Sequence, residues 1–360
     1  MPIVQHPLEK TDLLMTDAVI SQSAPPANLS SNQLILQVAS CSTVEQEILT
    51  QRYLVESLLG RGGFGVTFLA RNIHLPAQPF CLVKKFTPIF TDPKLVAIAR
   101  DQFGLEALIL SRLGSHAQIP TLLDYFQIEE NCYLVEEYIP GTVLSQLVID
   151  RGKFTEAQIE NFLIQMLRLL AYIHSHHLIH RDIKPQNIIL CQTDRRFVLV
   201  DFGAVKDLFP TTNGTKQGEY STAVGTPGFA PPEQLANYPV YASDLYALGM
   251  TCIYLLTGKE PGAFATDPYT CELIWADDLE ISIDLIEIIN KLIQITLTDR
   301  YQSATQVLVA LENRSTRAKL RSYLDQKHAI AKSEQIVGGV YYPAVVDWAL
   351  GIEAGKSKHH

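Results

Sequence analysis

The chain has 360 residues, of which 47% are hydrophobic and 19% are charged, a composition typical of a globular protein rather than a disordered one. That length suits one or two domains with a large buried core. The formal net charge of −9 argues against nucleic acid or an anionic membrane as a partner, because both attract cations.

The six cysteines are scattered and include no closely spaced pair, which predicts reduced, mostly buried thiols in a cytoplasmic protein. The first residues lack a basic stretch that leads into an apolar run, so we expect no signal peptide. We also expect no membrane span. The nearest apolar stretch, residues 336–352, is interrupted by Pro343 and Asp347.

The order of predicted elements favours an α+β protein with two lobes. Residues 1–50 show no clear period and form an expected N-terminal extension. Alternating apolar residues then predict a strand near residues 65–70, and further strands are expected over residues 80–86 and 132–138. Phe103, Ala107 and Leu110 recur at helical spacing. We therefore expect a first lobe over residues 51–139, built of a β-sheet plus one helix.

Helical patterns dominate the second half. Phe162, Met166 and Ile173 belong to one long apolar face, and further helices are predicted over residues 244–256 and 281–295. Short apolar runs at residues 188–190 and 198–200 predict small strands. We expect a mainly helical lobe over residues 140–315 and a C-terminal tail over residues 316–360, which begins basic and ends polar.

The most informative stretch runs from His180 to Asn187 as His-Arg-Asp-Ile-Lys-Pro-Gln-Asn, and Asp201-Phe202-Gly203 follow it. Asp182 can orient and deprotonate an alcohol, and Lys184 can contact a travelling phosphate. Asn187 and Asp201 can hold a magnesium ion through oxygen ligands. The stretch therefore predicts transfer of a phosphoryl group from a nucleotide to a hydroxyl.

Together with the glycine-rich stretch Leu58–Ala70, this sequence resembles eukaryotic-type (Hanks-type) serine/threonine protein kinases, especially the cyanobacterial ones. The resemblance covers about residues 53–311. It implies the two-lobed protein-kinase fold and transfer of the γ-phosphate of ATP to serine and threonine of protein substrates. The implied metal is Mg²⁺, with Mn²⁺ as an alternative, and the implied assembly is a homodimer for trans-autophosphorylation.

The glycines at 60, 62, 63 and 65 precede Val66 in a predicted hairpin. Glycine allows backbone amides to approach phosphates closely. A strand rather than a helix follows, so we expect the hairpin to lie over the nucleotide, as in kinases. The alternative is an ordinary tight hairpin. The set that we expect to bind ATP consists of Gly60, Gly62, Gly63, Gly65, Val66, Leu82, Lys84, Glu136, Glu137, Ile139, Ile189 and Asp201.

The phosphate-anchoring lysine falls on Lys84 by the family's apolar-Val-Lys form, and strand alternation points Lys85 to the other face, toward solvent. The resemblance implies that Glu106 pairs with Lys84; the alternative is a solvated helix glutamate. Leu82 is larger than the usual family residue, which suggests a tight adenine slot.

By the same resemblance, the strand near residue 136 ends in the hinge between the lobes, where backbone groups of Glu137 and Ile139 bind the adenine edge. Glu136 then lies at the back of the pocket. A carboxylate there must be paired, wet or protonated, so we hypothesise that it contacts the adenine amino group or Lys84. An error in the assumed strand register is the alternative.

The segment from Asp201 to Glu233 resembles the kinase activation segment, with Pro231-Pro232-Glu233 where the family has Ala-Pro-Glu. The resemblance implies that Thr226 hydrogen-bonds Asp182 and Lys184. It also implies three structural contacts: Glu233 with Arg300, Asp244 with the catalytic-loop backbone, and His180 with Phe202.

Arg181 beside the catalytic aspartate predicts a partner for a phosphate on this segment. Ser221 and Thr222 are the leading candidates, and Thr211, Thr212 and Thr215 are secondary ones. The neighbouring histidines 174, 176 and 177 suit a helix C-terminus better than a metal site.

Two other functions stay open. A catalytically weak pseudokinase scaffold would bind ATP without transferring phosphate, and the unusual residues Leu82, Glu136 and Pro231 keep that reading open. A small-molecule phosphotransferase would share the catalytic loop, but it would generally lack the Asp-Phe-Gly and Gly-Thr-Pro segments found here. Because each residue that performs chemistry is present, the sequence favours an active protein kinase.

Overall fold

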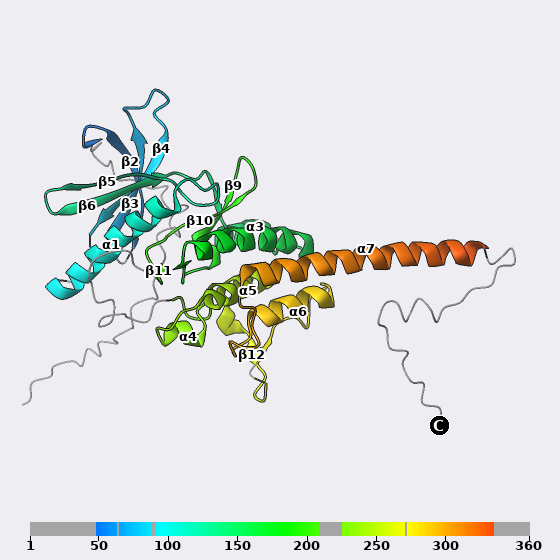
Figure 1. Ribbon diagram of the computed structural model, residues 1–360. Coiled ribbons are helices and arrows are strands. Elements are labelled where there is room, and N and C mark those ends of the chain that lie inside the picture. Colours follow the sequence, from blue (N-terminus) through cyan, green and yellow to red (C-terminus); the bar gives the residue numbers. More distant parts are fainter. Residues whose placement is uncertain (1–47, 63–64, 88–90, 209–224, 271, 335–360) are drawn as a thin grey trace, which may run out of the picture.

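A computed structural model describes residues 48–62, 65–87, 91–208, 225–270 and 272–334, and Figure 1 shows a sheet lobe above a helical lobe. The expected two-lobed α+β architecture is confirmed. Gly63 and the five phosphorylation candidates lie outside the described residues. In the described part of the chain, no helix combines the length and apolar character needed to cross a membrane.

The first lobe contains a six-stranded antiparallel sheet in the order β1-β2-β3-β4-β6-β5. Its strands are β1 (Ile48–Leu49), β2 (Tyr53–Gly62), β3 (Gly65–Asn72), β4 (Phe80–Phe86), β5 (Leu122–Ile128) and β6 (Asn131–Glu137). Helix α1 (Pro93–Leu113) begins at Asp92, whose carboxylate accepts a hydrogen bond from the Lys94 amide at 2.8 Å. Its buried face packs against the sheet through Phe103, whose ring centroid is 5.6 Å from that of Phe86.

The helical lobe consists of α2 (Leu144–Arg151), α3 (Glu156–Ser175), α4 (Pro232–Leu235), α5 (Tyr241–Thr257), α6 (Ile283–Leu292) and α7 (Ala304–Glu334), with 3₁₀ turns η1 (Pro185–Asn187) and η2 (Pro261–Ala263). Short strands complete it: β7 (Gly141–Val143), β8 (Leu178–Ile179), β9 (Ile188–Cys191), β10 (Phe197–Leu199), β11 (Lys206–Asp207), β12 (Ala265–Thr266) and β13 (Leu273–Ile274). The capping box of Thr155 and Gln158 starts α3. Its apolar face is fully buried, so α3 is the central helix of the lobe.

The expected boundary between lobe and tail, at residue 315, falls inside α7, which continues without a break to Glu334. Arg314 lies on this helix and pairs with two carboxylates of α3, those of Glu156 and Glu160. Figure 1 shows α7 extending well beyond the rest of the helical lobe. The basic stretch after residue 315, which was expected to begin the C-terminal tail, therefore continues α7. Arg314 attaches the preceding part of this helix to α3.

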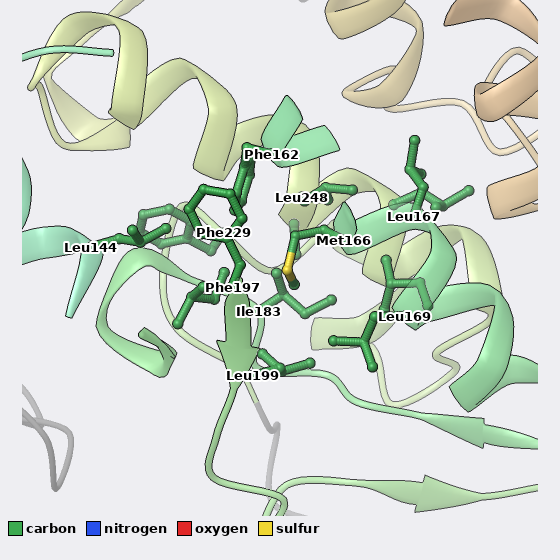
Figure 2. Close-up of a cluster of buried hydrophobic side chains, with 14 of the residues drawn as sticks. Leu144, Phe162, Met166, Leu167, Leu169, Ile183, Phe197, Leu199, Phe229 and Leu248 are labelled. Carbon is green, nitrogen blue, oxygen red and sulfur yellow. The ribbon is translucent and has the colours of Figure 1, made fainter. Parts of the chain in front are cut away.

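The catalytic loop rests on the core of the helical lobe. Ile183 is completely buried, and it points into a cluster that includes Met166 and Leu199 (Figure 2). Burying a side chain of this size stabilises the native state by about 1.5–3 kcal/mol. The loop that carries Asp182 and Lys184 is therefore fixed by the side chain that lies between them in sequence.

Candidate active site

Asp182 lies at the centre of a hydrogen-bonded group. Its carboxylate accepts from Thr226 Oγ1 at 2.8 Å and from Asn187 Nδ2 at 2.8 Å. Lys184 Nζ lies 2.9 Å from the same carboxylate and donates to Thr226 Oγ1 at 2.8 Å. One acceptor, one cation and one hydroxyl therefore share a position where a substrate alcohol can be held.

The backbone of this loop is held from below by Asp244, near the start of α5. The buried carboxylate accepts the amides of His180 and Arg181, each at 2.9 Å. Arg181 has a φ of 68°, an unusual backbone conformation for a non-glycine residue. Two charge-assisted hydrogen bonds to adjacent amides stabilise that conformation.

Asp244 also explains one of the neighbouring histidines. Burial alone would raise the pKa of Asp244, but the hydrogen bond from His174 and the nearby histidine and amide groups lower it below its usual value. His176 instead contacts the Tyr172 carbonyl at 2.9 Å, and His177 lies 3.4 Å from the Tyr241 hydroxyl. The three histidines therefore have separate partners, and His174 supports the loop rather than merely suiting a helix end.

Lys84 on β4 lies between two carboxylates of the first lobe. Its ammonium is 2.7 Å from Glu106 on α1 and 3.0 Å from Glu136 on β6. Glu106 and Glu136 are only 6% and 2% exposed, so the alternative of a solvated Glu106 is wrong. The pairing of Leu82 with Glu136 in the sheet places Glu136 diagonally beside Lys84 on the same face.

Lys85 points away from this cluster, as strand alternation requires, but it does not simply reach solvent. Its ammonium lies 5.6 Å from the centre of the Tyr133 ring, and the residue is partly buried. Lys85 therefore lies on the opposite face, as expected, where a neighbouring aromatic ring also attracts its cation.

The charges around Lys84 are unequal. Burial would lower the pKa of Lys84, but Glu106, Glu136 and Asp201 more than offset that effect and keep it raised, so the ammonium stays charged. Burial raises the pKa of Glu106 to about 7, and repulsion from Asp201 and Glu136 adds to the shift against the opposing attraction of Lys84. One cation therefore does not balance the surrounding carboxylates.

The glycine hairpin is formed by β2 and β3, which pair as far as Gly62 and Gly65. A Cβ at Gly65 would lie 2.0 Å from the Lys85 carbonyl oxygen. Close approach of β3 to β4 therefore requires glycine at this position, whatever the hairpin binds.

A small apolar cluster connects the hinge with the short strands of the helical lobe. Ile139 and Ile189 are 5% and 6% exposed and share this cluster with Val143. Val66 on β3 is also buried. The Glu137 side chain accepts from the amide and hydroxyl of Thr121, at 3.2 and 3.0 Å, and the Glu137 amide donates to the Thr121 carbonyl at 2.9 Å, so neither its carboxylate nor its amide is free to bind a base.

The donor set fits a hard divalent cation. Asn187 donates through Nδ2 to Asp182, while its buried Oδ1 has no hydrogen-bond partner among the described residues. Asp201 has a φ of 69°, and its Oδ1 lies near the backbone of Gly203. A buried amide oxygen without a partner, close to carboxylates, is the kind of ligand that Mg²⁺ takes.

The end of the activation segment is joined to the lobe by a buried ion pair. Arg300 Nη1 lies 2.6 Å from Glu233 Oε1, and the Ser243 hydroxyl donates to the same oxygen at 2.8 Å. Pro231 in place of the family's alanine leaves this pair intact. It directly precedes α4, where its fixed φ of −76° suits the N-cap.

Gln234 is a residue of the site that the sequence analysis missed. It is 2% exposed, and its Nε2 donates to the Arg181 carbonyl at 2.6 Å. Gln234 therefore joins α4, at the end of the activation segment, to the catalytic loop next to Asp182. A glutamine that follows a recognised motif gave no separate signal, because its partner lies far away in sequence.

Two further contacts fix the Asp-Phe-Gly stretch. The ring of Phe202 packs edge-on against His180, with 4.9 Å between centroids. Arg181 donates to the carbonyls of Ala204 and Val205. The catalytic loop and the start of the activation segment are thus coupled through both a ring contact and a cation.

Comparison with known proteins decides the family: the protein kinase domain matches residues 53–311. The chain belongs to the protein kinase family. It is 48% identical over 268 residues to serine/threonine-protein kinase B of Synechocystis sp. and 43% identical over 270 residues to serine/threonine-protein kinase PknA of Nostoc sp.. These matches cover 73% and 74% of this chain.

The resemblance to bacterial Hanks-type serine/threonine kinases is therefore confirmed. The same matches cover 47% and 48% of those two relatives, so the kinase chain spans about half of their length. Kinases of this family use ATP and a divalent metal and act on proteins.

Proposed function

We propose that the chain transfers the γ-phosphate of ATP to serine and threonine hydroxyls of proteins, with Mg²⁺ as the metal and Mn²⁺ as an alternative. The observation that carries this proposal is the hydrogen-bonded group of Asp182, Lys184 and Thr226. Thr226 contacts both the carboxylate and the ammonium of this group, so it holds the proton acceptor and the cation side by side.

In this mechanism Asp182 accepts the proton of the substrate hydroxyl and holds its oxygen toward the phosphate. Lys184 stays beside Asp182 and stabilises negative charge on the transferred group. Thr226 fixes both side chains, and Asn187 fixes the Asp182 carboxylate through Nδ2. Asn187 Oδ1 and Asp201 would hold the metal, which when bound neutralises charge on the phosphates.

The first lobe holds the nucleotide. Lys84 binds the α and β phosphates, and Glu106 keeps its ammonium in place. Gly60, Gly62, Gly63, Gly65 and Val66 cover the phosphates. The base lies between Leu82 and Ile189 and meets the backbone of Glu137 and Ile139. Because Glu136 reaches Lys84, we propose a second role for it in orienting that ammonium.

The test is transfer of labelled γ-phosphate from ATP to the chain itself and to a generic protein. We expect Asp182→Ala to abolish transfer while a fluorescent ATP analogue still binds. Asp277→Ala, at an exposed aspartate, is the matched control and should stay active. If the wild type bound ATP without transferring phosphate, the result would favour the pseudokinase scaffold. Transfer only to small alcohols would favour a small-molecule phosphotransferase.

We also propose autophosphorylation between two copies of the chain in a homodimer, in the cytoplasm. The four free cysteines that the structure describes are all buried, which is compatible with a reducing compartment. Mixing the wild type with the inactive Asp182→Ala chain tests whether one copy phosphorylates another. The inactive chain should become labelled, and labelling that appears only in the active chain would exclude the trans reaction.

A further inference from the structure

A concave surface of the helical lobe lies outside the nucleotide site. It consists of two adjoining hollows of about 150 and 180 Å³, which share Leu147, Arg151, Leu190 and Arg195. Lys153 and Phe154 line one of them. We call this surface the basic hollow. Each part is smaller than the roughly 300–1,000 Å³ of typical cofactor sites, so it suits single side chains of a larger partner.

The floor of the basic hollow is apolar and is built on the strand that leaves the catalytic loop. Leu147, Leu190 and Phe197 are all buried, with exposed fractions of 5%, 6% and 3%. Successive side chains of β9 point to opposite faces. Ile189 therefore belongs to the cluster beside the hinge, whereas Leu190 belongs to the floor of the hollow.

The rim is positively charged, and no carboxylate belongs to the described lining of the hollow. Arg151, Lys153 and Arg195 are exposed, and none of them forms an ion pair within the described residues. Asp150 and Asp194 are neighbours of these cations in sequence but do not line the hollow; Asp150 accepts from Gln146 at 2.7 Å, and Asp194 pairs with Arg196 at 2.8 Å. The other polar side chains of the lining are neutral.

Local backbone geometry holds these cations at the rim. Arg195 has a φ of 60° in the turn between β9 and β10, a conformation that costs a non-glycine residue about 1–2 kcal/mol. Gly152, with a φ of 85°, ends α2 between Arg151 and Lys153. The Lys153 stem lies beside Gly258, which leaves its ammonium free to reach water.

A favourable helix dipole accounts for Arg151, which lies in the last turn of α2. It does not account for Lys153, which lies beyond the helix end, or for Arg195, which lies on a different element and is held in a costly conformation. The hollow therefore combines unpaired cations at its rim with an apolar floor, although the chain as a whole has a net charge of −9. A ligand complementary to this surface supplies both negative charge and apolar side chains.

We propose that the basic hollow docks an acidic peptide segment of the protein substrate, with one apolar side chain on the floor and carboxylates at the rim. This inference rests on the proposed kinase function, because the docked segment belongs to the molecule that is phosphorylated. The hollow shares β9 with the nucleotide site, so the segment is held on the lobe that carries Asp182.

The first experiment measures binding of a fluorescent peptide in which a leucine is flanked by glutamates, using the full chain. We expect binding that weakens with added salt and that is lost when glutamines replace the glutamates. The variant Arg151→Ser/Lys153→Ser/Arg195→Ser should bind at least about tenfold more weakly. Lys94→Ser, at an exposed lysine of the first lobe, is the control and should leave binding unchanged.

Arg195→Gly separates docking from stability. Glycine accepts the positive φ without strain, so this variant should unfold at the same or a higher temperature and still bind about threefold more weakly. Unchanged peptide binding by the triple variant would overturn the proposal. Complete displacement of the peptide by millimolar inorganic phosphate would also overturn it, since it would indicate a small-anion site.

The second experiment distinguishes this inference from the proposed function. Two peptides carry the same acceptor serine, and only one carries the acidic segment. We expect equal kcat and a lower KM for the longer peptide, with the KM difference lost in the triple variant. No transfer to either peptide would contradict the kinase proposal. Equal KM values with active transfer would contradict only the docking proposal.

Discussion

Thr226 donates its hydroxyl proton to Asp182 at 2.8 Å, although 44 residues separate the two in sequence. The same hydroxyl oxygen accepts a hydrogen bond from the Lys184 ammonium at 2.8 Å. The end of the activation segment is thereby joined directly to the catalytic loop. A change in that segment can alter the orientation of the two side chains that we place at the reacting hydroxyl.

Replacing Thr226 tests this relationship. Thr226→Val removes the hydroxyl while keeping the side-chain shape, and we expect kcat to fall about tenfold to a hundredfold because Asp182 and Lys184 lose their common partner. Thr226→Ser should retain most of the activity. Steady-state kinetics with a peptide substrate measure both variants, and KM for ATP should stay within about twofold.

A melting temperature should accompany those measurements. If Thr226→Val lost activity only in proportion to a loss of folded protein, Thr226 would have no positioning role. Normal kcat in the valine variant would contradict the prediction directly.

The titration of Glu106 should make the stability of the ligand-free protein depend on pH, and Glu136 should increase that dependence. The folded-state pKa of Glu106 is raised from 4.5 to about 7. Its favourable contribution is therefore present below about pH 4.5 and is lost as the pH rises toward 7. Glu136→Gln removes one of the repelling charges, lowers the pKa of Glu106 and makes that loss smaller.

Thermal unfolding from pH 5 to pH 8 measures this effect. The melting temperature of Glu136→Gln relative to the wild type should increase with pH, by about 2–4 °C for each kcal/mol. Glu312→Gln, at an exposed glutamate, is the control and should show a constant difference. A difference that falls with pH would contradict the prediction.

Removing only one partner of the Glu233–Arg300 pair should destabilise the folded protein strongly. Arg300 is 2% exposed, so Arg300→Met leaves a carboxylate with little compensation and should lower the free energy of unfolding by about 3–5 kcal/mol. The double variant Glu233→Gln/Arg300→Met should lose less than the sum of the two single changes. Denaturant unfolding of all four proteins completes the cycle, and simple additivity would show that the pair is not coupled.

Autophosphorylation should place a phosphate on Ser221 or Thr222. In the described part of the chain, the Arg181 guanidinium donates to the carbonyl oxygens of Ala204 and Val205, and burial lowers its pKa to about 10 despite the nearby Asp244. A phosphate would give this guanidinium a charged partner. Mass spectrometry of active enzyme should detect the modification, and finding both residues unmodified would contradict the prediction.

Much of the fold followed from local sequence. The apolar residues of α1 and α3 recur at helical spacing, those of β3 alternate, and β6 contains a short continuous apolar run, so both the elements and their order were predictable. The extent of α7 was not. Its start was expected within the helical lobe, but its sequence becomes polar and charged after residue 311, so its continuation to Glu334 was not predicted.

The sequence alone determined which residues could perform phosphoryl transfer, because aspartate, lysine and asparagine in one short loop carry their chemistry with them. Only the tertiary structure decided how charges balance around Lys84, why Gln234 matters and where unpaired cations surround an apolar floor. These properties depend on burial and on contacts between segments distant in the chain. A side chain's pKa and partners are set by that environment, which residue identity does not specify.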